Sequence, residues 1–129
     1  MFRARDAFSS FSVDNVEKAK EFYGKTLGIE VTDEMGGLEL HVGEQRVFLY
    51  PKEDHKPASF TVLNFPVDDI ANAYDDLTKR GVRFGYQNDD DLGTDERGIH
   101  WGVQSGEGPN IAWFRDPAGN ILSVIQDKG

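Results

Sequence analysis

The sequence predicts an α+β fold made of two copies of a βαβββ module, and three observations lead to this prediction. The motif VDNV at residues 13–16 recurs as VDDI at residues 67–70. After each copy, apolar residues follow a helical spacing as far as a glycine, Gly28 or Gly81. The remaining segments carry aromatic and β-branched residues in strand-like patterns. Because the chain has 129 residues, both copies fit within one compact domain.

The two helices have clear expected ends. Asp14 and Asp68 are the expected N-caps, because a carboxylate there accepts hydrogen bonds from the free N–H groups of the first turn, and Glu17 completes a capping-box pattern. Gly28 and Gly81 suit the left-handed position that ends a helix. The apolar residues expected on the buried helix faces are Val16, Ala19, Tyr23 and Leu27 in the first copy and Ile70, Ala73, Tyr74 and Leu77 in the second.

Strands are expected in the segments between these helices. Leu38 to Val42 alternates apolar and polar residues, which is typical of a strand with one buried face, and residues 116–120 (DPAGN) are typical of a hairpin turn. The expected strands are Phe8–Val13, Gly28–Val31, Leu38–Val42 and Arg46–Tyr50 in the first copy, and Ser59–Val67, Gly81–Phe84, Ile111–Phe114 and Ile121–Ile125 in the second.

A long segment, Tyr86–Gly108, interrupts the second copy. It is rich in Gly and Asp and contains one aromatic stretch, Ile99–Trp101. Loops of this length are uncommon inside compact domains and often carry function. The segment is therefore expected either to border a binding pocket or to be an acidic insertion without a specific role.

Composition excludes several classes of function. The 14 Lys and Arg against 23 Asp and Glu give a net charge of −9, which disfavours binding to nucleic acid or to anionic membranes. The absence of cysteine excludes disulfides, thiolate nucleophiles and iron–sulfur clusters. Because the N-terminus lacks the apolar core of a signal peptide and no segment is apolar enough to span a membrane, we expect a cytoplasmic protein.

With its two βαβββ modules, the repeated motif before each helix, Phe22-Tyr23 and the DPAGN turn, the chain resembles the vicinal oxygen chelate superfamily from about Ala7 to Gln126. That superfamily includes glyoxalase I, bleomycin-resistance proteins, fosfomycin-resistance enzymes, methylmalonyl-CoA epimerase and extradiol dioxygenases. The resemblance implies one domain over residues 1–129, with module 1 at about 5–52 and module 2 at about 58–127. It also implies a concave, partly open mixed β-sheet barrel with a helix packed outside each module, and a homodimer.

The resemblance also identifies where a metal would bind. Catalytic relatives hold a divalent metal with His, Gln or Glu from the first and last strand of each module. The matching positions here are Phe8, Val62 and Ser123, and the segment Arg46–Pro51 contains no His, Asp, Glu or Gln. Because these side chains offer neither imidazole nor carboxylate to offset dehydration of a divalent ion, we expect no metal site and no cofactor.

The expected site is a ligand-binding cavity on the sheet, where aromatic rings and a few polar groups suit a flat small molecule. Among the histidines, His41 has the strongest case, because its strand could face the cavity beside Glu39. About half of the candidate aromatic residues are also expected to serve only as core. The candidate lining residues are Phe8, Ser10, His41, Tyr50, Phe60, Val62, Asn64, His100, Trp101, Trp113 and Ser123.

Three functional hypotheses follow. The first is a metal-free binding protein of the glyoxalase/bleomycin-resistance type that holds a hydrophobic or cationic small molecule, with neither nucleic acid nor membrane as a partner. The second is an enzyme. It would be either a glyoxalase-like lyase, isomerase or dioxygenase with unusual metal ligands, or a metal-free acid–base catalyst using His41, His100 or Tyr50. The third is an interaction module whose cavity is filled by its own side chains.

Overall fold

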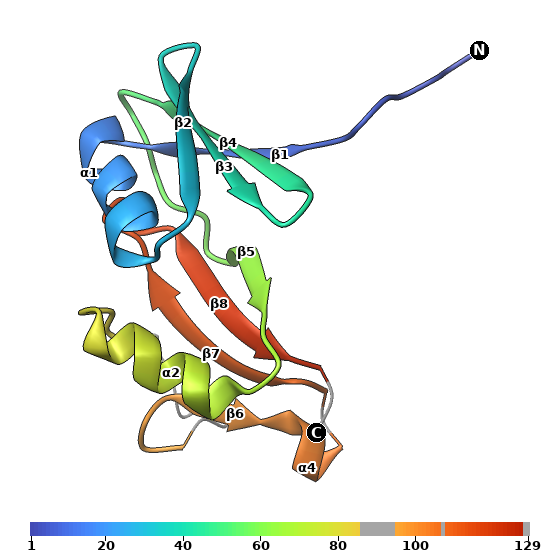
Figure 1. The fold of residues 1–129 in the computed structure, drawn as a ribbon, viewed down its shortest axis with the longest axis vertical. Helices are drawn as coiled ribbons and strands as arrows, with labels where there is room; N and C mark the ends of the chain where they lie inside the picture. The colour runs from blue at the N-terminus through green and yellow to red at the C-terminus, as the bar shows by residue number, and fades with distance from the viewer. Residues whose placement is uncertain (86–94, 107, 128–129) are drawn as a thin grey trace. The chain divides into compact units, whose positions relative to one another are not determined.

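The structure is a computed structural model that describes residues 1–85, 95–106 and 108–127, and it divides into two compact units, Met1–Pro57 and Ala58–Gly129 (Figure 1). Each unit contains one four-stranded mixed sheet together with helical segments. The predicted α+β fold with two repeated modules is therefore confirmed. Within the described residues, no helix is long and apolar enough to cross a membrane.

The first unit is an open sheet with the strand order β1-β4-β3-β2. Strand β1 runs parallel to β4, and the other neighbouring strands are antiparallel. The elements are β1 (Ser9–Val13), α1 (Val16–Lys20), the π-helix η1 (Glu21–Thr26), β2 (Glu30–Glu34), β3 (Gly37–Val42) and β4 (Gln45–Pro51). The alternating pattern in β3 places Leu38 and Leu40 in the core, where α1 covers this face of the sheet.

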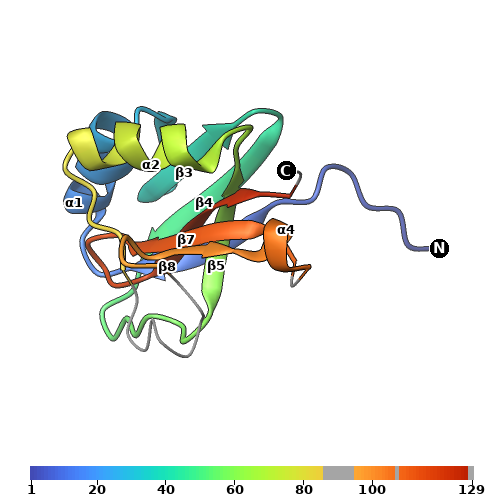
Figure 2. The ribbon, with the colours of Figure 1, turned by 90° about the horizontal axis from the view of Figure 1, so that it is seen from below.

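The second unit repeats this arrangement, with the strand order β5-β8-β7-β6. Its elements are β5 (Thr61–Pro66), α2 (Ile70–Lys79), β6 (Ile99–Trp101), α4 (Gly102–Ser105), β7 (Asn110–Arg115) and β8 (Ile121–Gln126). Figure 2 shows α2 on one side of β7 and β8. Between them, the ring of Phe84 lies 4.5 Å from that of Tyr74 and 5.4 Å from that of Phe114. These aromatic contacts fix the helix on the sheet.

The hairpin turn predicted at residues 116–120 is also confirmed. The buried carboxylate of Asp116 accepts hydrogen bonds from the backbone N–H groups of Ala118 (3.0 Å) and Asn120 (2.8 Å). Gly119 has a φ of 85°, in the left-handed region that favours glycine. The turn therefore joins β7 directly to β8, which pair along their whole length.

The predicted N-caps are wrong by one residue in both modules. The side chain of Asn15 accepts a hydrogen bond from Lys18 N (3.0 Å), and that of Asp69 accepts one from Asn72 N (3.1 Å). In each motif two neighbouring residues carry a suitable oxygen. The backbone is still extended at Asn15 and at Asp69, so each helix begins one residue later than predicted and these residues are the N-caps.

Two further differences concern the segments that follow α1 and α2. After α1 the first helix continues as the π-helix η1 before it ends at Gly28, which has the expected positive φ of 74°. The predicted strand Gly81–Phe84 is wrong, because only Phe84 forms an isolated bridge, to Phe114. The fourth strand of the second sheet is instead β6, the aromatic stretch of the long segment, whose residues 86–94 lie outside the described residues.

Candidate functional site

One face of the first unit's sheet lies opposite α1, and we call it the open face. The strand register shows which residues share it, because side chains of paired neighbours point to the same side. Phe8 precedes β1 and is 55% exposed. The open face carries Phe8, Ser10, Ser12, Glu30, Thr32, Glu39, His41, Arg46, Phe48 and Tyr50.

A group of polar side chains occupies the middle of the open face. Nε2 of His41 lies 2.9 Å from the hydroxyl of Thr32 and 3.4 Å from a carboxylate oxygen of Glu39. The other oxygen of Glu39 lies 3.7 Å from the guanidinium of Arg46. Only 17% of the Glu39 side chain and 28% of the His41 side chain are exposed. The carboxylate is thus partly withdrawn from water, which strengthens its electrostatic interactions.

Aromatic rings border this polar group. The guanidinium of Arg46 lies 5.2 Å from the centroid of the Phe8 ring, within the range of a cation–π interaction. On the other side, the rings of Phe48 and Tyr50 are stacked, with centroids 6.2 Å apart. The open face therefore offers flat apolar surface next to a partly buried carboxylate.

A second polar contact joins β1 to the segment after β4. The hydroxyl of Ser12 and Nδ1 of His55 are 2.6 Å apart, and both residues are half-buried. The register places Ser12 beside Tyr50. This contact fixes the segment after β4 against the end of β1.

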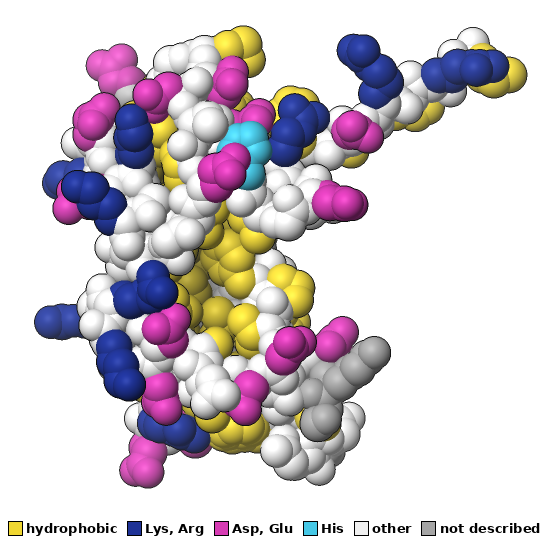
Figure 3. All heavy atoms as spheres, viewed as in Figure 1, with side chains coloured by type: hydrophobic (Ala, Val, Ile, Leu, Met, Phe, Trp, Pro, Cys, Tyr) yellow, Lys and Arg dark blue, Asp and Glu magenta, His cyan; other side chains and the backbone are white. Residues whose placement is uncertain are grey.

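In the second unit, four predicted site residues lie on the sheet face opposite α2. The hydroxyl of the buried Ser123 lies 2.5 Å from Oδ1 of Asn64, and the neighbouring Trp113 donates its indole N–H to the hydroxyl of Thr61 (3.1 Å). His100 lies on the same face, beside Ile111. In Figure 3, hydrophobic side chains gather over β5 and β8, whereas charges of both signs cover the helices.

The remaining predicted residues of the second unit lie elsewhere. Phe60 stands just before β5 and is 65% exposed, and Val62 lies at the irregularity where the β5–β8 register shifts. Trp101 follows His100 in β6 and lies on the α2 side. There its indole donates a hydrogen bond to Asp95 (2.9 Å), and the guanidinium of Arg97 lies 5.8 Å from its ring.

Asp95 has a perturbed carboxyl group. Burial by itself would raise the pKa of Asp95. The hydrogen bonds from the Trp101 indole and from the backbone N–H groups of Ile99 and Arg97, with the charge of Arg97, outweigh it and hold that pKa below its ordinary value. Because all these partners lie in β6 or in the turn just before it, we assign Asp95 a structural role.

The positions that would hold a metal in catalytic relatives do not fit one. Phe8 and Val62 have no donor atom, and the hydroxyl of Ser123 is already bonded to Asn64. Across residues 1–85, 95–106 and 108–127, no three side chains of the His, Cys, Asp and Glu types gather in a metal-binding group. Glu39 and His41 form only a pair, and divalent ions need more ligands than that.

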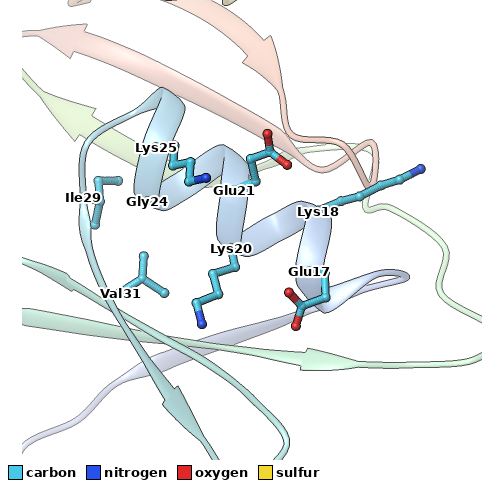
Figure 4. A pocket seen from close by; sticks show the side chains of 8 residues that line it. All are labelled: Glu17, Lys18, Lys20, Glu21, Gly24, Lys25, Ile29 and Val31. Carbon is cyan, nitrogen blue, oxygen red and sulfur yellow. The ribbon is translucent and has the colours of Figure 1, made fainter.

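A groove of about 520 Å³ lies on the other side of the first unit, between the helix and β2 (Figure 4). Figure 4 shows Lys20 and Val31 pointing into it, and Lys20 forms an ion pair with Asp33 (3.2 Å). None of the predicted site residues lies here. The groove is lined by Glu17, Lys18, Lys20, Glu21, Gly24, Lys25, Ile29 and Val31. Because most of this lining consists of exposed charges of both signs, we place the candidate site on the open face instead.

Sequence reasoning missed several residues of the open face. Arg46 and Phe48 alternate with the buried Val47 and Leu49, so their strand has the same two-residue period as β3. Because Phe48 is itself apolar, residues 47–49 form a continuous apolar run, and the sequence does not show which of them face the core. Thr32 could be found only from the pairing of β2 with β3.

Comparisons with known proteins agree with this fold. Residues 8–124 match the model of the Glyoxalase/Bleomycin resistance protein/Dioxygenase superfamily. The chain is 25% identical to the uncharacterized protein YraH of Bacillus subtilis (strain 168) over 130 residues, which cover 88% of this chain and 91% of YraH.

Two solved structures are similar in fold over nearly the whole chain. One is the genomically encoded fosfomycin resistance protein FosX from Listeria monocytogenes, with a TM-score of 0.69 and 13% identity, covering 98% of this chain and 96% of FosX. The other is TnmS3, an antibiotic binding protein from Streptomyces sp. CB03234. Its TM-score is 0.63 and its identity 23%, covering 98% of this chain and 100% of TnmS3.

Proposed function

The chain belongs to the glyoxalase/bleomycin resistance protein/dioxygenase superfamily, and from this premise we propose that it binds a flat, hydrophobic or cationic small molecule on the open face without a bound metal. Membership confirms the family resemblance of the sequence, but members of one fold differ widely in activity. The proposal therefore depends on the residues of the open face.

The observation that carries the proposal is the partly buried carboxylate of Glu39 with aromatic rings beside it. Phe48 is the direct register neighbour of Glu39, so a ring stacked on Phe48 would bring a positive group close to the carboxylate. A ligand cation would compete with Arg46, whose guanidinium lies 3.7 Å away and whose side chain is 42% exposed. The net charge of −9 attracts cations in addition.

The comparisons offer support of the same kind. TnmS3, which has a similar fold, is an antibiotic binding protein. A binding role without a metal also agrees with the donor-poor side chains at the positions that correspond to metal ligands. We therefore favour binding over metal-assisted turnover.

The proposal is tested by calorimetric titration with three compounds that share one ring system. These are 9-aminoacridine, which is a cation near neutral pH, neutral acridine, and anionic acridine-9-carboxylate. We expect affinity to fall in that order. Replacing Glu39 by Gln should weaken binding of the cation by about threefold to tenfold, or about 0.7–1.4 kcal/mol, and leave acridine almost unaffected.

The matched control is Glu44→Gln, which removes an equal charge from the exposed turn between β3 and β4. Equal losses in the two variants would mean that only overall charge matters, and would contradict a site at Glu39. Elemental analysis of protein purified without chelator tests the metal-free part. Stoichiometric nickel, manganese, iron or zinc held by side chains would overturn it.

A further inference from the structure

We propose that Glu39 and His41 form a proton-accepting pair, so that the open face can remove a proton from a bound, flat carbon acid. The proposal rests on the proposed position of the ligand and adds a reaction to it. It requires an imidazole whose proton is fixed on one nitrogen while the other nitrogen is available to the ligand.

The surroundings of His41 fix that proton. Nε2 faces two oxygen atoms, the Thr32 hydroxyl at 2.9 Å and the Glu39 carboxylate at 3.4 Å. A carboxylate only accepts hydrogen bonds, so the neutral imidazole is most stable with its hydrogen on Nε2. The lone pair then lies on Nδ1, which has no hydrogen-bond partner among the described residues.

The pair also stabilises the product of proton transfer. When Nδ1 accepts a proton, the imidazolium lies 3.4 Å from the carboxylate of Glu39, a side chain that is only 17% exposed, so the two opposite charges attract each other. The other charged groups facing His41 are its register neighbours, Arg46 on β4 and Glu30 on β2. The guanidinium of Arg46, 3.7 Å from a Glu39 carboxylate oxygen, is a cation of the same face that would stabilise negative charge developing on the substrate.

The reaction is a simple proton abstraction. The proton leaves a carbon atom of the substrate for Nδ1 of His41, and the electron pair of the C–H bond moves towards an electronegative atom of the same molecule. No oxidant, reductant or metal is needed. Acid–base catalysis by one positioned side chain typically contributes about a hundredfold to ten-thousandfold in rate.

We test the pair with 5-nitrobenzisoxazole, a flat aromatic carbon acid. Removal of its carbon-bound proton forms a nitrile while the ring N–O bond breaks, and the product, 2-cyano-4-nitrophenolate, is yellow. We expect a rate above that of free imidazole at equal concentration. His41→Gln should lower the rate at least tenfold.

The same assay separates the roles of the neighbouring residues. Glu39→Gln should lower the rate severalfold, because the imidazolium loses its counter-charge. Thr32→Val should lower it less, because the Glu39 carboxylate still lies 3.4 Å from Nε2. Glu44→Gln, which changes an exposed residue of the turn between β3 and β4, should retain the full rate. Thermal unfolding of each variant shows whether a loss of rate comes from loss of the fold. His41→Asn is a second variant that also removes the base.

Binding of 6-nitrobenzotriazole, an unreactive analogue of the probe, separates the two proposals. If His41→Gln binds the analogue as the wild type does and also keeps its rate, Glu39 and His41 are not the base and this inference is overturned. If the wild type binds the analogue but reacts no faster than free imidazole, the inference is again overturned while the binding function stands. If the wild type binds neither the analogue nor the acridines, the proposed function fails and the inference fails with it.

Discussion

Asp95 shows how one side chain can hold a turn whose conformation the surrounding sequence does not specify. Its carboxylate accepts hydrogen bonds from the indole of Trp101 and from the backbone N–H groups of Arg97 and Ile99, at 2.9 to 3.0 Å. The guanidinium of Arg97 in turn lies 5.7 Å from the centroid of the Tyr74 ring and 5.8 Å from that of the Trp101 ring. The sequence shows only an acidic residue at the end of an acidic stretch, so neither this role nor the place of Trp101 could be predicted from it.

Replacing Asp95 by Asn should lower the free energy of unfolding by about 1–3 kcal/mol at neutral pH, because the hydrogen bonds lose a charged acceptor. The pKa of Asp95 is lowered in the folded chain, so its contribution is complete above the unfolded pKa of about 4 and is lost as the pH falls through the folded pKa. Urea unfolding of both proteins at several pH values checks this.

The difference between wild type and Asp95→Asn should therefore narrow at strongly acidic pH. Glu96→Gln serves as the control, since Glu96 is the exposed neighbour of Asp95. A difference that stays constant down to the lowest pH would show that the charge of Asp95 is not what stabilises the turn.

The elements with a regular sequence pattern are those that could be predicted best. The alternation from Leu38 to Val42 predicts which side of β3 is buried, and with it the shared face of Glu39 and His41. The predicted strand at Gly81–Phe84 is wrong. A short apolar segment can also be buried without joining a sheet, and here Phe84 forms one isolated bridge and packs against Tyr74 of α2. Tertiary contacts, and not the local sequence pattern, decide whether such a segment forms a strand.

The two N-cap candidates before α2 give a direct test of the helix start. Asp69→Ala should destabilise the chain by about 1 kcal/mol, because the N–H group of Asn72 loses its acceptor. Asp68→Ala, one residue earlier and exposed, should change the free energy of unfolding much less. Urea unfolding of the two variants checks this. Equal effects would contradict the observed cap.

The start of β3 depends on a glycine for a steric reason. A Cβ atom on Gly37 would overlap the backbone carbonyl of Leu49 in the neighbouring strand. Neither of the two backbones can move away to make room without breaking the sheet. We expect Gly37→Ala to cost about 1–3 kcal/mol or to prevent folding. Gly24→Ala is the matched control, because its Cβ would meet only the Val31 side chain at an ordinary 3.7 Å. Thermal unfolding compares the stability of the two variants. If Gly24→Ala lost as much stability as Gly37→Ala, the steric explanation would be contradicted.

At the scale of the molecule, the repeat in the sequence predicted two similar units, and the structure shows that their sheets share one strand order. The candidate site was predictable only in part. Phe8, Ser10, His41 and Tyr50 share the open face, but the contacts of His41 with Thr32 and of Ser12 with His55 join distant segments and leave no local pattern. The single domain, the homodimer and the cytoplasmic location stay predictions.

Binding of 9-aminoacridine to isotope-labelled protein, followed by NMR of the backbone amides, reports most directly where a ligand lies. The largest and saturable shifts should fall on β1, β3 and β4, around Ser10, Glu39 and Phe48, and should shrink in Glu39→Gln. Shifts confined to the charged groove beside α1, or no saturable shift at all, would contradict ligand binding on the open face.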